Sequence, residues 1–127
     1  MGKLCPDAVL DVFLARIDDA DRLFVCSTQP TTYAEAAATY DLATVELTPG
    51  AGNGDFTLGN GDSPGRKVTI AQQANASITD SGTAAHVALG LTTGSVLLYV
   101  TTCTEQVLTS GGTVTIPAWD VEISDAT

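Results

Sequence analysis

Positively charged residues are scarce in this sequence. Of its 127 residues only five are Lys or Arg, whereas fifteen are Asp or Glu, and the formal net charge at pH 7 is −10. Because Lys and Arg supply the affinity for phosphate backbones and anionic lipid surfaces, we expect neither a nucleic-acid nor a membrane partner. A basic protein surface remains compatible with this charge.

Long hydrophobic runs are lacking too. The longest ones, such as residues 96–100, are far too short to span a bilayer. The first seven residues lack the basic region, the apolar stretch and the small-residue cleavage site of a secretion signal. These features predict a product that stays in the cytoplasm where it is made.

Cysteine and histidine are few, with Cys5, Cys26 and Cys103 far apart and His86 alone. A zinc site would need all four side chains, and no Cys-x-x-Cys spacing favours one. We therefore predict no metal site, and we interpret the cysteines as small buried apolar residues. A disulfide between Cys5 and Cys26, formed after release into an oxidising medium, stays open as an alternative.

Two stretches raise the question of calcium. Residues 18–21 read Asp-Asp-Ala-Asp, and Gly-Asn-Gly-Asp occurs at residues 52–55 and again at 59–62. Neither stretch has the ligand spacing of an EF-hand, and two copies seven residues apart do not make a calcium-binding repeat. We interpret both as turns. Whether the Gly-Asn-Gly-Asp turns bind calcium stays open.

The patterns that carry catalysis are missing as well. With one histidine, no nucleophile stands at a characteristic spacing from a base, and no glycine-rich phosphate loop follows a strand. We expect no enzymatic activity and no cofactor. His86 is expected to be a hydrogen-bonding residue at the surface or in an interface.

The composition that remains is that of a folded protein. A hydrophobic content of 44% with only 16% charged residues argues against disorder, and the length fits a single domain. We divide this domain into an N-terminal arm and helix, residues 1–21, and a β domain, residues 22–127, with a loose loop at residues 49–65.

Two helices are predicted. The first spans residues 6–19, begins with Pro6 in its first turn, and carries one apolar stripe that should cover the sheet. The second spans residues 33–40, where Thr32 and Glu35 have capping-box spacing and alanines follow. The stripe of the first helix consists of Val9, Leu10, Phe13, Leu14 and Ile17.

Runs of alternating apolar and polar residues between Gly, Ser and Thr turns predict antiparallel strands. We place them at residues 22–27, 42–48, 56–58, 66–73, 76–79, 82–91, 96–103 and 113–123. The fold class is therefore mainly β (α+β), an antiparallel β-sandwich or barrel-like domain with an N-terminal amphipathic helix and a second short helix. Because the apolar parity of the last strand changes before Trp119, we predict a β-bulge at Pro117 and Ala118.

The strand at residues 96–103 is apolar on both faces: Val96, Leu98 and Val100 share one face, and Leu97, Tyr99 and Cys103 share the other. Such a strand is covered on both sides, either centrally beneath a helix or at a subunit interface. The N-terminal helix is a candidate for the second cover.

Arg66 and Lys67 are neighbours on the strand at residues 66–73, so they point to opposite faces. They pair either with carboxylates of their own chain or with a neighbouring subunit.

Several segments carry a family likeness. They are residues 5–11 (Cys-Pro-Asp-Ala-Val-Leu-Asp), 29–36, 61–69, 82–89, 98–102 and 117–123. Over nearly the whole chain, these segments resemble a group of small virion structural proteins that tailed bacteriophages and prophages encode. The resemblance implies a role in the phage particle, and it transfers no catalytic or binding residue.

The resemblance does not specify a place in the particle. For that place, our leading hypothesis is a capsid decoration (cement) protein that is assembled in the host cytoplasm and located in the virion. It would bind the outer shell where major capsid subunits meet, as a homo-oligomer, with a trimer favoured. The candidate contacts with other subunits or with the capsid are Arg66, Lys67, His86, Leu97, Tyr99 and Trp119.

Two alternatives stay open. One is an adaptor or fibre component of the neck, collar or tail. The other is a carbohydrate-binding module whose stacking residues would be Trp119, Tyr99, Tyr33 and Tyr40.

Overall fold

The computed structural model describes residues 7–61 and 65–124. It is 54% strand and 15% helix, and every pairing between its named strands is antiparallel. This confirms the predicted fold class, mainly β with two helices. The elements are α1 (Asp7–Ile17), β1 (Arg22–Cys26), η1 (Glu35–Thr39), β2 (Asp41–Glu46), β3 (Phe56–Asn60), β4 (Gly65–Ile70), β5 (Gln73–Ser77), β6 (Gly82–Leu91), β7 (Val96–Leu108), β8 (Thr113–Ile116) and β9 (Trp119–Ser124).

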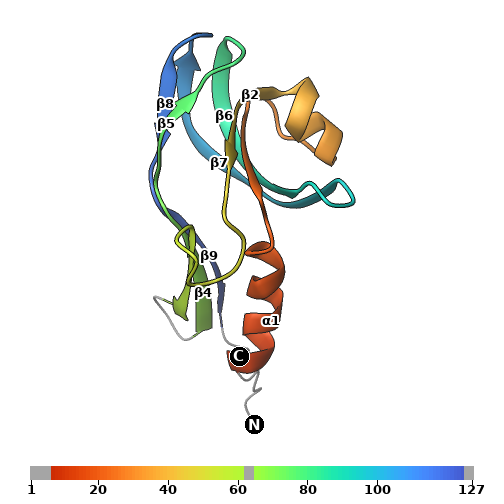
Figure 1. Cartoon of the computed structure of the whole chain (residues 1–127), viewed down its shortest axis with the longest axis vertical. Helices are drawn as coiled ribbons and strands as arrows, with labels where there is room; N and C mark the ends of the chain where they lie inside the picture. Colours follow the sequence, from red (N-terminus) through yellow and green to blue (C-terminus); the bar gives the residue numbers. More distant parts are fainter. Residues whose placement is uncertain (1–6, 62–64, 125–127) are drawn as a thin grey trace. The chain divides into compact units, whose positions relative to one another are not determined.

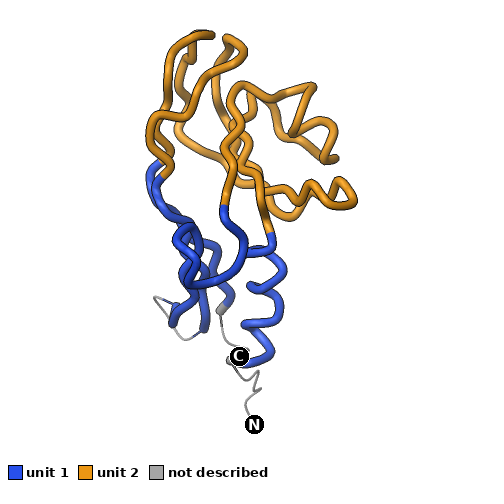
Figure 2. The backbone as a smooth tube through the Cα atoms, in the orientation of Figure 1, with its two compact units in different colours: residues 1–19, 48–72, 117–127 blue, residues 20–47, 73–116 orange. Residues whose placement is uncertain are grey.

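The chain forms two compact units (Figure 2). Unit 1 comprises residues 1–19, 48–72 and 117–127, and unit 2 comprises residues 20–47 and 73–116. Each unit is therefore built from segments that are distant in sequence. The division of one domain at residue 21 stays a prediction.

Unit 1 contains α1 and a three-stranded sheet with the order β3-β4-β9 (Figure 1). The register places Leu58, Val68 and Val121 side by side across the three strands, so apolar side chains gather on one face. Helix α1 packs against β4, and the core lies between helix and sheet. Its buried side chains are Leu10, Leu14, Ile17, Phe56, Val68, Ile70 and Val121.

Two strands predicted as continuous are interrupted. The predicted strand 66–73 ends at Ile70 as β4, and only its last residue, Gln73, belongs to β5. The predicted strand 113–123 is divided into β8 and β9. The N–H of Ala71 donates to the carbonyl of Asp55 at 2.8 Å and so continues the β3–β4 register by one residue. On the other side of this segment, Pro117 has no N–H to give. The bulge predicted at Pro117 and Ala118 is thus a break, where the chain passes from unit 2 to unit 1.

Unit 2 contains a four-stranded sheet with the order β2-β1-β6-β7 and a two-stranded sheet formed by β5 and β8. Leu23, Phe24, Val25 and Cys26 are all buried in β1, so this sheet is covered on both faces. The short π-helix η1 covers one face. There Phe24, Cys26, Ala36 and Ala88 form a buried cluster, around which Tyr33, Ala37, Tyr40, Leu97 and Val100 pack.

The predicted capping contact begins this second helical segment. The Thr32 hydroxyl accepts the N–H of Glu35 at 3.2 Å. The Glu35 carboxylate accepts from the N–H and the hydroxyl of Thr31, at 2.8 and 2.7 Å, instead of from Thr32. These hydrogen bonds lower the pKa of Glu35.

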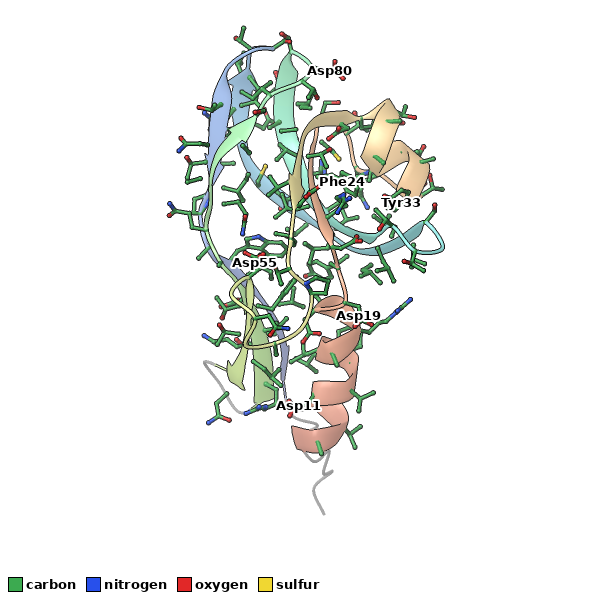
Figure 3. The ribbon with its side chains drawn as sticks, viewed as in Figure 1. Asp11, Asp19, Phe24, Tyr33, Asp55 and Asp80 are labelled. Carbon is green, nitrogen blue, oxygen red and sulfur yellow. The ribbon has the colours of Figure 1, made fainter. Side chains whose placement is uncertain are left out.

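Close packing under η1 requires glycine at position 90. A β-carbon added at Gly90 would lie 2.8 Å from Phe24 Cε2 and 3.0 Å from Tyr33 Cε2. The two rings meet edge to face with centroids 5.6 Å apart, and they lie side by side in Figure 3. The sheet and η1 can therefore pack this closely only because Gly90 has no side chain.

Candidate interaction surfaces

The six predicted contact residues fall into two groups. Arg66, Lys67 and Trp119 lie on β4 and β9 of unit 1, whereas His86, Leu97 and Tyr99 lie on β6 and β7 of unit 2. Within each unit they also point to different faces. The structure does not gather them into one surface on either unit.

Arg66 and Lys67 point to opposite faces of β4, as their adjacency predicts. Arg66 Nε donates to Asp11 Oδ1 on α1 at 2.7 Å, and Arg66 Nη1 donates to Asn60 Oδ1 at 2.8 Å. Asp11 lies on the side of α1 that faces the sheet (Figure 3). Lys67 Nζ lies 3.6 Å from Asp120 Oδ2. Both cations thus pair with carboxylates of their own chain and help to hold unit 1 together.

His86 is half-buried in β6. It lies opposite Cys26 on one side and Thr102 on the other, on the face that η1 covers over Ala88. Its Nδ1 has no hydrogen-bond partner among the described residues. The expectation of a hydrogen-bonding residue at the surface or in an interface stays a prediction.

Asp41, Cys26 and His86 are cross-strand neighbours on β2, β1 and β6. Burial raises the pKa of Asp41. The hydrogen bond from Thr44 acts to lower this pKa, and the Asp80 carboxylate acts to raise it further. Burial, with smaller contributions from Asp41 and Cys103, raises the pKa of Cys26 to about 12. The Cys26 thiol therefore stays protonated at neutral pH, which does not suit a nucleophile.

The same cysteine suits a packing role. Cys26 is completely buried, and its Sγ lies 3.7 Å from the carbonyl of Ala36. Cys26 and Cys103 are both free thiols, and Cys5 lies outside the described residues. Among residues 7–61 and 65–124, no three His, Cys, Asp or Glu side chains are arranged to hold a metal ion.

The acidic stretch at residues 18–21 is divided among separate partners. Asp19 pairs with Arg16 at 3.3 Å. Asp21 accepts from the Thr92 hydroxyl and, at 3.0 Å, from the Thr92 N–H. Asp18 is buried, and this burial, with the Asp19 charge, raises its pKa. The chain forms a turn at residues 18–19, as the turn interpretation predicts.

The first Gly-Asn-Gly-Asp stretch forms a turn closed by its own side chains. Asn53 Nδ2 donates to the carbonyl of Pro49 at 2.9 Å, and Asp55 Oδ2 accepts the Thr48 N–H at 2.6 Å. In the second stretch, Gly59 and Asn60 belong to β3, so the predicted strand 56–58 extends by two residues. Asp62 lies outside the described residues.

Strand β7 lies at the edge of its sheet, not in its centre. Its pairing with β6 shifts between Leu89 and Gly90, so Leu98 is an extra residue and Leu97 and Val100 face the same cluster. The predicted parity of this strand is therefore wrong, because a bulge changes it. The cover of this face comes from η1, and residues 96–100 remain half-buried.

Helix α1 exposes a surface that the sequence analysis missed. Leu10, Leu14 and Ile17 of the predicted stripe are buried, but Val9 and Phe13 are 57% and 52% exposed, and Val12 beside them is 70% exposed. At about 100° per residue, these three residues are centred roughly 110° around the helix from the buried row, and Phe13 adjoins Ile17. A helical wheel that included Val12 would have shown an apolar arc wider than the buried row. We call Val9, Val12 and Phe13 the outer face of α1.

In the part of the chain that the structure describes, no helix is both long and apolar enough to cross a membrane. No protein-family model, curated protein or solved structure matches the chain. The resemblance to phage virion proteins therefore stays a prediction.

Proposed function

We propose that the chain is a virion structural protein of a tailed bacteriophage, and specifically a capsid decoration protein that binds the outer shell and stabilises contacts between capsomers. The observation that carries this proposal is the outer face of α1. Three large apolar side chains exposed on one helix are typical of a surface that binds another protein. The family likeness implies a role in the phage particle, and we take the shell to be the binding partner.

The charge of the chain supports the same role. A net charge of −10 keeps a protein soluble at the high concentration that a decoration protein reaches before assembly. It also favours binding to a basic surface and disfavours casual association between copies.

A homo-oligomer is part of the proposal. Residues 96–104 of β7 carry no charge, and the aliphatic side chains at residues 96–100 are half-buried at a sheet edge. Contact between copies at this edge would bury them without opposing like charges. The trimer remains the favoured order.

The carbohydrate-binding alternative gains no support from the aromatic side chains. Tyr33 and Tyr40 pack on the cluster under η1. Tyr99 pairs with Leu89, on the other face of the same sheet, and Trp119 belongs to unit 1. No flat row of exposed rings results within either unit.

Mixing the purified protein with capsids that lack decoration tests the proposal. We expect the protein to sediment with the capsids until the sites are filled, and to raise the temperature at which the shells come apart. Protein that stays in the supernatant at every ratio would contradict the decoration role.

A further inference from the structure

The apolar arc of helix α1 is wider than the part that the sheet covers. Its inner row, Leu10 and Leu14 with Ile17, is buried against the sheet of unit 1, whereas the outer face is exposed. An apolar helix stripe is normally covered across its whole width. The described residues, 7–61 and 65–124, leave the outer face uncovered.

The inner side is fixed firmly enough to present the outer face as a rigid surface. Arg66 joins β4 to Asp11 through its Nε at 2.7 Å and its Nη2 at 3.4 Å. At the carboxyl end of the helix, the N–H of Gly50 donates to the carbonyl of Asp18 at 2.8 Å. Substitutions at Val12 or Phe13 leave all of these contacts in place.

We infer that the outer face of α1 inserts into an apolar groove on a partner protein, and that the rim of this groove is basic. Val9, Val12 and Phe13 have the i, i+3, i+4 spacing by which amphipathic helices occupy hydrophobic grooves. The inference rests on the proposed function in taking the partner to be a shell protein.

Charge argues for such a partner and against a second copy of this chain. Unit 1 contains nine acidic and four basic residues. The three basic side chains that the structure describes there already pair with acidic ones, Arg16 with Asp19, Arg66 with Asp11 and Lys67 with Asp120. Two copies docked through α1 would bring acidic surfaces together without free cations between them. A basic rim would instead attract the acidic surface of unit 1.

The first test measures binding of variants to undecorated capsids. Val12→Asp and Phe13→Asp are expected to weaken binding at least about tenfold, as loss of a buried anchor does, with unchanged circular dichroism and melting temperature. Val107→Asp is the matched control, because Val107 is 77% exposed and lies in unit 2. It should bind within about twofold of wild type, and raising the salt concentration should weaken wild-type binding. Equal binding by Val12→Asp and Val107→Asp would overturn the inference.

The second test identifies the partner without assuming the shell. p-Benzoylphenylalanine is placed at position 12, or at position 107 as the control, and assembled particles are irradiated. A cross-link specific to position 12 that maps to an apolar, Lys- or Arg-flanked segment of the major capsid protein supports both proposals. The same type of cross-link to a tail protein supports the groove but refutes decoration. A cross-link to a second copy, or none above the level at position 107, overturns the inference.

Discussion

Units 1 and 2 have the same net charge but are held together differently. Unit 1 has nine acidic and four basic residues, and unit 2 has six and one. In unit 1, ion pairs join α1 to β4 and β4 to β9. In unit 2, whose single cation is Arg22, a tight apolar cluster joins η1 to the sheet. Unit 1 thus combines ion pairs with an apolar core and leaves Val9, Val12 and Phe13 of its helix exposed, whereas unit 2 relies mainly on apolar packing.

The largest expected effect is loss of a ring from the cluster in unit 2. Phe24→Ala removes a 2% exposed side chain and should lower the free energy of unfolding by about 3–5 kcal/mol, from lost transfer energy and the cavity left behind. Urea denaturation measures it, with Val107→Ala as an exposed control that changes little. A loss below about 1 kcal/mol would mean that η1 does not depend on this cluster.

Substitutions at two glycines compare how tightly the two units are packed. Gly90→Ala forces a methyl group against Phe24 and Tyr33 and should cost about 1–3 kcal/mol through overpacking. Gly59→Ala in β3 of unit 1 meets no atom within 4 Å and should change stability by less than about 0.5 kcal/mol. The melting temperatures of both variants, from thermal unfolding, measure the two effects. Equal melting temperatures would show that the packing under η1 is loose.

The ion pair of unit 1 should matter less than the cluster of unit 2. Asp11→Ala removes the partially buried partner of Arg66, whose side chain is 18% exposed, and should cost about 1–2 kcal/mol. Asp19→Ala breaks an exposed pair with Arg16 and should cost less than about 0.5 kcal/mol. A double-mutant cycle of Asp11 with Arg66 isolates the interaction. A coupling energy near zero would show that this ion pair does not stabilise unit 1.

The smallest effects are pH-dependent and have opposite signs within unit 2. Burial raises the pKa of Asp41, so its contribution to stability is present below the unfolded pKa and is lost as pH rises through the folded pKa. Asp41→Asn should therefore stabilise the protein at pH 7, and the gain should shrink toward pH 3.

Asp21 should show the opposite pH dependence. Burial acts to raise its pKa, but hydrogen bonds from Thr92 and the Arg22 charge lower it. Its contribution is therefore present above the unfolded pKa and is lost as pH falls through the folded pKa. Asp21→Asn should destabilise at pH 7 and converge with wild type in acid. Unfolding curves from pH 3 to 7 measure both variants, and equal signs would refute these pKa directions.

Periodicity in the sequence was enough to find most elements and several faces. It located α1, β1 and β6, and it placed Asp120 and Glu122 on the face of β9 opposite Val121, as the register shows. It failed where contacts between distant residues decide. The break at residues 71–72 lies where Pro117, distant in sequence, is opposite and has no N–H to donate, and the bulge at Leu98 depends on how β6 and β7 pair.

The candidate site shows the same limit. Adjacency predicted that Arg66 and Lys67 point apart, but the partner of Arg66 is Asp11, 55 residues earlier in the chain, and no local pattern connects the two. The outer face of α1 was present in the sequence as Val9, Val12 and Phe13. Which side chains of this wide apolar arc meet the sheet depends on packing, and the structure shows it.

If the proposed function is right, particles from a host that carries the gene should contain the chain, and quantitative mass spectrometry of their separated heads and tails is the decisive measurement. A protein that decorates the shell should be found in the heads in an amount comparable to that of the major capsid protein. Recovery only with tails, at a small fraction of that amount, or absence from both fractions would contradict the account.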